Sequence, residues 1–378
     1  MMKVLSLFAN IGVAEAYLDD IGFEVALANE IDKKRADIYS YIYPNTEMIC
    51  GDITDEKVMD NICKKSKEHG IDIIIATPPC QGMSTAGKMG ENDTRNELIK
   101  YAVKAIMEIK PKYVMLENVP KQMTTKINYE GNMILIPEYL KKSLSEEYWI
   151  DSKVINICNY SVPQSRERAI FLLSRKDQEK MWEIPSPESK VRTLEDAIGH
   201  LPRLDPLIKD INYEEHLNIF PDYEKNKKIA LTYSPWHTPP SHIYRQVNAM
   251  MHTPTGETAF NNSKLEYRPL KKNGEPVRGY KNTYKRQKWN EPAYTITMYN
   301  RTISSQNNVH PGRFVGIDDN GDEMYSDPRV LTLYEIMLVM SLPEKWNIPK
   351  NSSESYMRSV IGEGIPPLFV KKLFNQLI

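Results

Sequence analysis

Cysteine is scarce in this 378-residue sequence, and its four cysteines (Cys50, Cys63, Cys80 and Cys158) lie far apart. None belongs to a CxxC pair, so the sequence predicts no metal site and no disulfide framework. Long apolar runs are also lacking, since a stretch such as 71–76 is far too short to cross a bilayer. No cleavage-type site follows the first residues, so no signal peptide is expected. The expected location is a reducing cytoplasm, without membrane attachment.

The chain also lacks an excess of charge of either sign. It has 49 Lys and Arg residues against 50 Asp and Glu residues, for a formal net charge of −1. A basic field over the whole protein is therefore excluded, and any nucleic-acid partner must bind a local patch. The 41% of hydrophobic and 26% of charged residues are typical of a globular protein with a sizeable core. The length favours two domains.

The first half alternates between strand and helix patterns. Strand patterns fall at 3–8, 23–29, 46–50, 71–76 and 112–116, and helical patterns fall at 13–19, 33–41 and 96–108. This alternation is typical of an α/β fold with a doubly wound, Rossmann-like parallel sheet. Because right-handed crossovers bring the loops after the strands to one edge of the sheet, ligands are expected at that edge.

After about Pro185 the alternation stops. Residues up to about Asn290 are rich in Pro, Asn, Tyr and Lys, which indicates a second, smaller and irregular domain. Within it, residues 264–291 carry nine basic and three acidic side chains, with tyrosines and Trp289 between them. Such a run is either a solvated loop or a nucleic-acid contact surface. Helical patterning returns at 329–340 and 367–377.

Three polar elements carry candidate chemistry. Cys80 follows two prolines directly after a strand of β-branched residues, which is not the setting of an ordinary buried cysteine. The glycine-rich polar loop 82–94 behind it is expected to act as a lid. Glu117-Asn118-Val119 ends the next strand, and Arg166 and Arg168 precede the strand pattern at 169–173. Taken singly, the glutamate and the arginines would more often be solvated surface groups.

In their order and spacing, Pro79-Cys80-Gln81, Glu117-Asn118-Val119 and Gln164-x-Arg166-x-Arg168 resemble the DNA (cytosine-5)-methyltransferase family, in its bacterial restriction-modification form. Further segments are similar to other motifs of that family, and the likeness covers the chain except about 183–288. These segments are 7–12, 29–32, 51–53, 329–335 and 361–367.

The resemblance implies a reaction and a cofactor. Cys80 would add to C6 of a cytosine that has flipped out of double-stranded DNA, Glu117 would act at N3, and Arg168 would bind O2. Arg166 would add electrostatic support or hold the active-site loop, and Asn118 would tie the cysteine loop to the Glu117 loop. S-adenosylmethionine would be the methyl donor. The residues implied for its site are Phe8, Ala9, Ile11, Gly12, Glu30, Ile31, Asp52, Ile53, Pro79, Leu98, Glu363 and Gly364.

The resemblance also implies a division of labour. Residues 1–183, completed by 347–378, would form the catalytic and cofactor-binding domain, 184–328 the target-recognition domain, and 329–346 a connecting hinge. The residues expected to contact DNA are Gln81, Ser84, Arg95, Arg268, Arg278 and Arg286. The expected form is a monomer at the bacterial nucleoid, with a cognate restriction endonuclease as a possible partner in the same system.

The sequence departs from the family pattern at several positions, among them Ser6, which stands where the family usually has an acidic or polar residue. Asn10 and Val13 stand where the family has glycine, and Glu363 stands where it has asparagine. Asn10 can take the left-handed turn conformation that glycine would supply. Glu363 would either turn away from the carboxylate of the cofactor or weaken cofactor binding.

Other functions are open to the same fold. An RNA (tRNA) cytosine-5 methyltransferase would carry a shorter middle domain with a cysteine-containing motif, which this sequence lacks. A non-catalytic DNA-binding relative would not need Cys80, Glu117 and Arg168. A nicotinamide-dependent enzyme is excluded because no GxGxxG follows the first strand.

Overall fold

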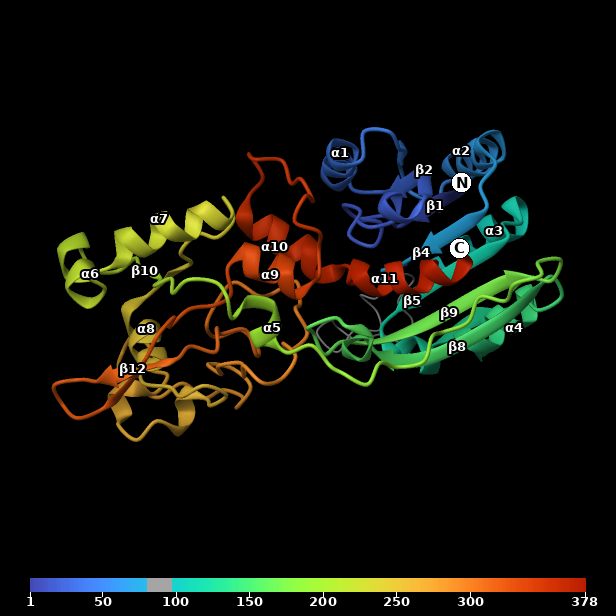
Figure 1. Cartoon of the computed structure of the whole chain (residues 1–378). Coiled ribbons are helices and arrows are strands. Elements are labelled where there is room, and N and C mark those ends of the chain that lie inside the picture. Colours follow the sequence, from blue (N-terminus) through green and yellow to red (C-terminus); the bar gives the residue numbers. More distant parts are fainter. Residues whose placement is uncertain (80–96) are drawn as a thin grey trace.

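A seven-stranded sheet forms the centre of the first half of the chain in the computed structural model, which describes residues 1–79 and 97–378 (Figure 1). Its strands are β1 (Met2–Leu7), β2 (Phe23–Glu30), β3 (Glu47–Cys50), β4 (Ile73–Ala76), β5 (Tyr113–Asn118), β8 (Tyr148–Asn156) and β9 (Glu167–Arg175). Cys80, Gln81, Ser84, Arg95 and the expected lid 82–94 lie outside the described residues.

The strand order is β3-β2-β1-β4-β5-β9-β8. The first five strands run parallel, whereas β9 runs antiparallel to both of its neighbours. The order reverses between β1 and β4, whose ends pair Leu7 with Ala76. Such a reversal opens a crevice beyond the carboxyl ends of the strands. The doubly wound sheet predicted from the sequence is confirmed, with an antiparallel edge added to it.

Helices cover the sheet on both faces (Figure 1). Side chains of α2 (Glu56–His69), α3 (Leu98–Ile109) and α4 (Ile136–Leu144) share one apolar core with the strands. The opposite face is covered by α11 (Pro367–Phe374), near the end of the chain, together with Trp182. The indole Nε1 of Trp182 donates to the carbonyl of Leu373 at 2.8 Å. A small hairpin, β6 (Lys126–Tyr129) and β7 (Asn132–Leu135), precedes α4.

Two of the predicted helices differ from the structure. Instead of the helix expected at 13–19, residues 14–18 form successive turns, followed by a single 3₁₀ turn at Asp19–Ile21. Val13, Glu15 and Leu18 are all buried there, so packing on several sides overrides the helical pattern. The helix expected at 329–340 begins only at α9 (Leu333–Val339), where Thr332 forms a capping box with Glu335. The expected C-terminal helix, 367–377, consists of α11 and a final 3₁₀ turn.

The middle region is only partly irregular. It contains α5 (Leu194–Ile198), α6 (Tyr213–Ile219), α7 (Tyr223–Tyr233) and α8 (Tyr244–Met251), with two short strand pairs, β10 (Leu207–Ile208) with β11 (Ser241–His242) and β12 (Phe314–Ile317) with β13 (Glu323–Tyr325). Residues 252–313 form 3₁₀ turns, isolated bridges and loops. Helices α9 and α10 (Glu354–Glu363) lie between this region and the sheet (Figure 1). No helix in the described ranges is long and apolar enough to span a membrane.

Candidate active site and cofactor crevice

An ion pair stands at the carboxyl edge of the sheet, beside the cysteine loop. Glu117 lies near the end of β5 and Arg168 near the start of β9, its antiparallel neighbour. The Nε atom of Arg168 is 2.6 Å from Oε1 of Glu117, and each side chain is about one-tenth exposed. The backbone register of two adjacent strands therefore brings together the carboxylate and the guanidinium that the motifs singled out.

The chain just before Cys80 is held on two sides. The amide of Asn118 donates to the carbonyl of Pro78 at 3.0 Å, which is the predicted tether between the two loops. The hydroxyl of Thr77 donates to the carbonyl of Phe8 at 3.3 Å, in the turn after β1. These two bonds hold Thr77 and Pro78, which follow directly after β4. Thr77 was not anticipated, because its partner is a backbone carbonyl.

Arg166 has a different place from the one expected of a catalytic group. It is 2% exposed, and its guanidinium donates to the carbonyls of Ile296 at 2.7 Å and Gly362 at 3.0 Å. These bonds join β9, the strand of Arg168, to the segment around residue 296 and to α10. Of the two roles expected for Arg166, this arrangement favours holding the site together over direct contact with a substrate.

The crevice beyond β1 and β2 is shaped by a strained turn. Phe8, Asn10 and Gly12 have φ angles of 59°, 50° and 81°, so the expected left-handed conformation of Asn10 is confirmed. A Cβ atom on Gly12 would lie 2.1 Å from the ring of Tyr43. The carboxylate of Glu30 accepts from the backbone N–H groups of Asn10 at 2.8 Å and Asp32 at 2.9 Å. Burial raises the pKa of Glu30, although these N–H donors oppose the rise.

The residues around this crevice fit an adenosyl group. Ile31, at the end of β2, is 62% exposed and offers an apolar surface beside the acceptor Glu30. Asp52, after β3, is exposed, and its carboxylate accepts from the N–H of Thr54. Ile11 and Ile53 are buried, so these two can offer only main-chain groups to a ligand. The remaining described positions implied for the site are Ala9 (buried), Phe8, Leu98 and Gly364 (half-buried) and Pro79 (exposed).

The departures from the family pattern are compensated within the fold. Val13 is buried, and a Cβ atom on Gly364 would lie 2.7 Å from the Cβ of Val13, so the missing glycine at 13 is matched by a glycine at 364. The carboxylate of Glu363 lies 2.9 Å from Nη1 of Arg35 on α1 (Lys33–Ile42), so its charge is paired. Sequence reasoning missed Arg35, because no local pattern connects it with a residue 328 positions later.

The family assignment follows from comparison with known proteins. The model of the C-5 cytosine-specific DNA methylase family matches residues 2–378. The chain belongs to that family. The type II methyltransferase M1.HgaI of Avibacterium volantium is 38% identical over 378 residues, which covers 99% of this chain and 97% of the relative.

Two solved structures share the fold of this methyltransferase. A candidate DNA modification methyltransferase encoded within a prophage (E. coli) is 19% identical, with a TM-score of 0.67, and covers all of this chain and 98% of its own. Spodoptera frugiperda DNMT2 is 15% identical, with a TM-score of 0.57, over all of this chain and 99% of its own. The protein is thus a DNA (cytosine-5)-methyltransferase of the type II restriction-modification kind, which uses S-adenosylmethionine.

The three arginines expected to read bases in the methyltransferase differ in exposure. Arg278 is exposed and makes no hydrogen bond or ion pair within the described ranges. Arg268 is exposed, but its Nε donates to the carbonyl of Asn262 at 2.6 Å. Arg286 is fully buried, and its guanidinium donates to the carbonyls of Met250 and His310. The prediction that Arg286 contacts a base is therefore wrong, since its guanidinium stabilises the interior of the middle region.

Proposed function

We propose that this methyltransferase acts on one cytosine of a specific duplex sequence, with Cys80 as the nucleophile. The observation that carries the proposal is the Glu117–Arg168 pair beside the tethered Pro78, two residues before Cys80. The thiol, the acid and the guanidinium would converge on one ring at the carboxyl edge of the sheet. A base stacked in a duplex hides C6 from a thiol, so the target has to flip out of the helix.

The proposed chemistry uses the three side chains in sequence. The thiolate of Cys80 forms a bond to C6, and the displaced ring electrons make C5 nucleophilic. Glu117 supplies a hydrogen bond or a proton at N3, and Arg168 offsets negative charge at O2. S-adenosylmethionine, when bound, offers an electrophilic methyl group to C5. Loss of the C5 proton then expels the sulfur of Cys80 and restores the aromatic ring.

The chain's own residues would hold the adenosyl group of the cofactor. Glu30 is proposed to accept from the ribose hydroxyls and Asp52 from the adenine amino group, with Phe8 and Ile31 against the ring. Glu30→Ala and Asp52→Ala should each weaken cofactor binding by about 1.5–3 kcal/mol, the cost of a lost hydrogen bond to a charged group. Calorimetry with S-adenosylmethionine measures the change.

The matched control for these two variants is Asp60→Ala, which removes an exposed carboxylate on α2, away from the crevice. Its affinity for the cofactor should equal that of the wild type. Unchanged affinity in both Glu30→Ala and Asp52→Ala would contradict this placement of the adenosine.

The region from 184 to 328 is proposed as the target-recognition domain, between the catalytic domain of 1–183 with 347–378 and the hinge of 329–346. Arg278 is the strongest candidate for reading guanine, because an exposed planar fork matches O6 and N7. We further infer a monomer at the bacterial nucleoid, with a cognate restriction endonuclease cutting the same unmethylated site.

Arg278→Ala should therefore change sequence specificity, whereas Arg286→Ala should change stability. Arg278→Ala should relax specificity at one base position, at a cost of about 1–3 kcal/mol, without lowering the melting temperature. Arg286→Ala should lower the melting temperature but leave the sequence preference of the surviving enzyme unchanged, since three backbone carbonyls lose their donor. Methylomes from an unmethylated host, together with thermal melts, separate the two. If Arg278→Ala keeps every position of the site, the reader must be sought near Trp236 to Arg245.

The proposed function is tested by transfer of a tritiated methyl group from S-adenosylmethionine to duplex DNA, single-stranded DNA and tRNA. We expect the label in duplex DNA, and sequencing of the product should place it at one cytosine of a fixed sequence. Transfer to tRNA alone, or transfer to duplex DNA without sequence preference, would overturn the proposal.

A further inference from the structure

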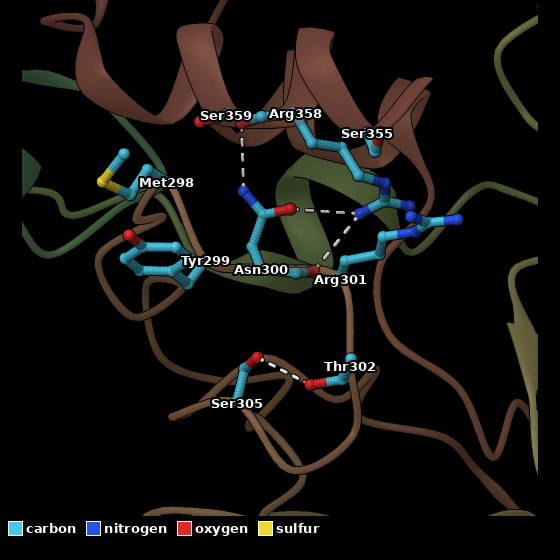
Figure 2. Close-up of a pocket in the computed structure, with 9 residues that line it drawn as sticks. All are labelled: Met298, Tyr299, Asn300, Arg301, Thr302, Ser305, Ser355, Arg358 and Ser359. Carbon is cyan, nitrogen blue, oxygen red and sulfur yellow. Dashed lines mark hydrogen bonds between the residues drawn. The ribbon is translucent and has the colours of Figure 1, made fainter. Parts of the chain in front are cut away.

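A cavity of about 340 Å³ lies between the loop 298–305 and helix α10, outside the catalytic and cofactor sites. In Figure 2 the helix forms one wall and the loop the other, with Asn300 bridging them. The side-chain amide of Asn300 donates to the carbonyl of Arg358 at 3.1 Å, so the wall is fixed from behind. The cavity is therefore part of the folded framework.

The lining of the cavity is basic and rich in hydroxyl groups. Serine or threonine hydroxyls come from both walls, Tyr299 is 67% exposed, and no carboxylate lines the space. The polar side chains on this surface include Arg301, Thr302, Ser305, Ser355 and Ser359. Hydroxyl donors with a guanidinium, and without an acid, form a surface suited to an anion, above all to a phosphate.

Arg301 carries the charge of this surface. From residue 286 to 358 the other arginines are occupied: Arg286, Arg329 and Arg358 are buried and hydrogen-bonded, and Arg313 pairs with Glu195. Arg301 is exposed and makes no hydrogen bond or ion pair within the described part of the chain. A guanidinium left unpaired at a cavity mouth is available to an external anion.

The cavity also lies close to the catalytic arginine. The carbonyl of Ile296 accepts from Arg166, which is two residues before Arg168. The next residues pack tightly on α10, since a Cβ atom on Gly362 would lie 2.4 Å from the carbonyl oxygen of Thr297. Arg301 is five residues after Ile296, a reach of at most about 18 Å of extended chain. The loop that carries Arg301 is therefore linked, through Ile296 and Arg166, to the strand that carries Arg168.

We propose that this cavity binds a backbone phosphate of the DNA strand, within a few nucleotides of the flipped cytosine. Arg301 supplies the charge, and the hydroxyls of Ser355, Ser359 and Thr302 supply further hydrogen bonds. The inference rests on the proposed action on duplex DNA. In this proposal Arg301 fixes the position of the DNA backbone and does not read the base sequence.

The test compares wild type, Arg301→Ala and the control Lys67→Ala, which removes one exposed positive charge near the end of α2, at the opposite edge of the sheet. DNA affinity is measured at several salt concentrations. Each lost phosphate contact reduces the slope of log K against log salt by about 0.9. We expect that reduction for Arg301→Ala, an unchanged slope for Lys67→Ala, and equal melting temperatures for all three.

A second arm locates the phosphate. Duplexes with one uncharged methylphosphonate linkage are scanned along the strand that carries the target cytosine. At one position, the uncharged linkage should lower the DNA affinity of wild type but leave the affinity of Arg301→Ala unchanged. The proposal is overturned if no linkage shows this coupling, or if the Arg301→Ala slope equals that of wild type. A third outcome also overturns it. If inorganic phosphate raises the melting temperature of wild type but not of Arg301→Ala, and no linkage distinguishes the two proteins in the scan, the cavity binds a free anion.

The two proposals fail in distinguishable ways. If wild type transfers no methyl group to duplex DNA, the proposed function is lost. If wild type methylates duplex DNA and Arg301→Ala behaves like Lys67→Ala, only the phosphate site is lost.

Discussion

Cys80→Ser is expected to reduce methyl transfer by on the order of 10⁴-fold or more, since losing the nucleophile of a covalent enzyme removes the step on which the others depend. A serine hydroxyl is a far weaker nucleophile than a thiolate at neutral pH. Binding of S-adenosylmethionine and the melting temperature should stay close to wild type. Single-turnover assays with duplex DNA measure the loss.

The covalent step has its own readout. DNA containing 5-fluorocytosine should trap wild type as an adduct that survives SDS, because fluorine at C5 cannot leave as a proton does. Cys50→Ser is the matched control, since Cys50 is an exposed thiol at the end of β3. It should form the adduct, and Cys80→Ser should not. Near-normal turnover in Cys80→Ser would refute the nucleophile assignment.

Arg329→Ala is expected to destabilise the protein by about 3–5 kcal/mol, the cost of leaving buried partners of an ion pair without their counter-charge. The guanidinium of Arg329 is fully buried and contacts both oxygens of Glu335, at 2.7 and 2.9 Å, and Asp327 at 2.9 Å. Chemical denaturation at pH 7 measures the difference. The control is Arg313→Ala, whose pair with Glu195 is about half exposed and should contribute at most about 1 kcal/mol.

The loss in Arg329→Ala should depend on pH. Burial alone would raise the pKa of Glu335, but the charge of Arg329 holds it well below its usual value. In wild type the contribution of this carboxylate is therefore present above its unfolded pKa near 4.5 and lost as the pH falls further. Without Arg329, burial raises the pKa of Glu335 above its unfolded value near 4.5. The variant then loses stability as the pH rises from the unfolded pKa through the raised folded pKa. The gap between wild type and variant should therefore be wider at pH 7.5 than at pH 5, and an equal gap would contradict this account.

The sequence was sufficient where structure depends on local pattern. The β-branched run at 71–76 and the apolar run at 112–116 predicted β4 and β5, and strands of a parallel sheet place their ends at one edge. The approach of Asn118 to Pro78, just after the end of β4, follows from that rule. Asn10 could be predicted too, because the turn needs a left-handed residue and asparagine tolerates that conformation.

Contacts between distant residues could not be predicted in this way. Arg278 and Arg286 stand in the same basic run, yet one is exposed and the other buried, because the partners of Arg286 are backbone carbonyls 24 to 41 residues away. The conflict at Glu363 was visible in the sequence, but its resolution by Arg35 depends on how α1 and α10 pack. A backbone carbonyl has no sequence signature, and neither does an ion pair across the fold.

The covering of the sheet by α11 has a consequence for how the protein is made. One apolar face of the sheet, which includes Phe23 and packs against Trp182, is covered by residues from 367 onward. Between Trp182 and Pro367 a ribosome adds 185 residues, which takes about 10–40 s at roughly 5–20 residues per second. During that interval the apolar face of the nascent sheet stays exposed to solvent. The yield of folded enzyme should therefore depend on chaperones and on the speed of translation through the middle region. Slow codons there would favour aggregation, even though they lie far from every catalytic residue.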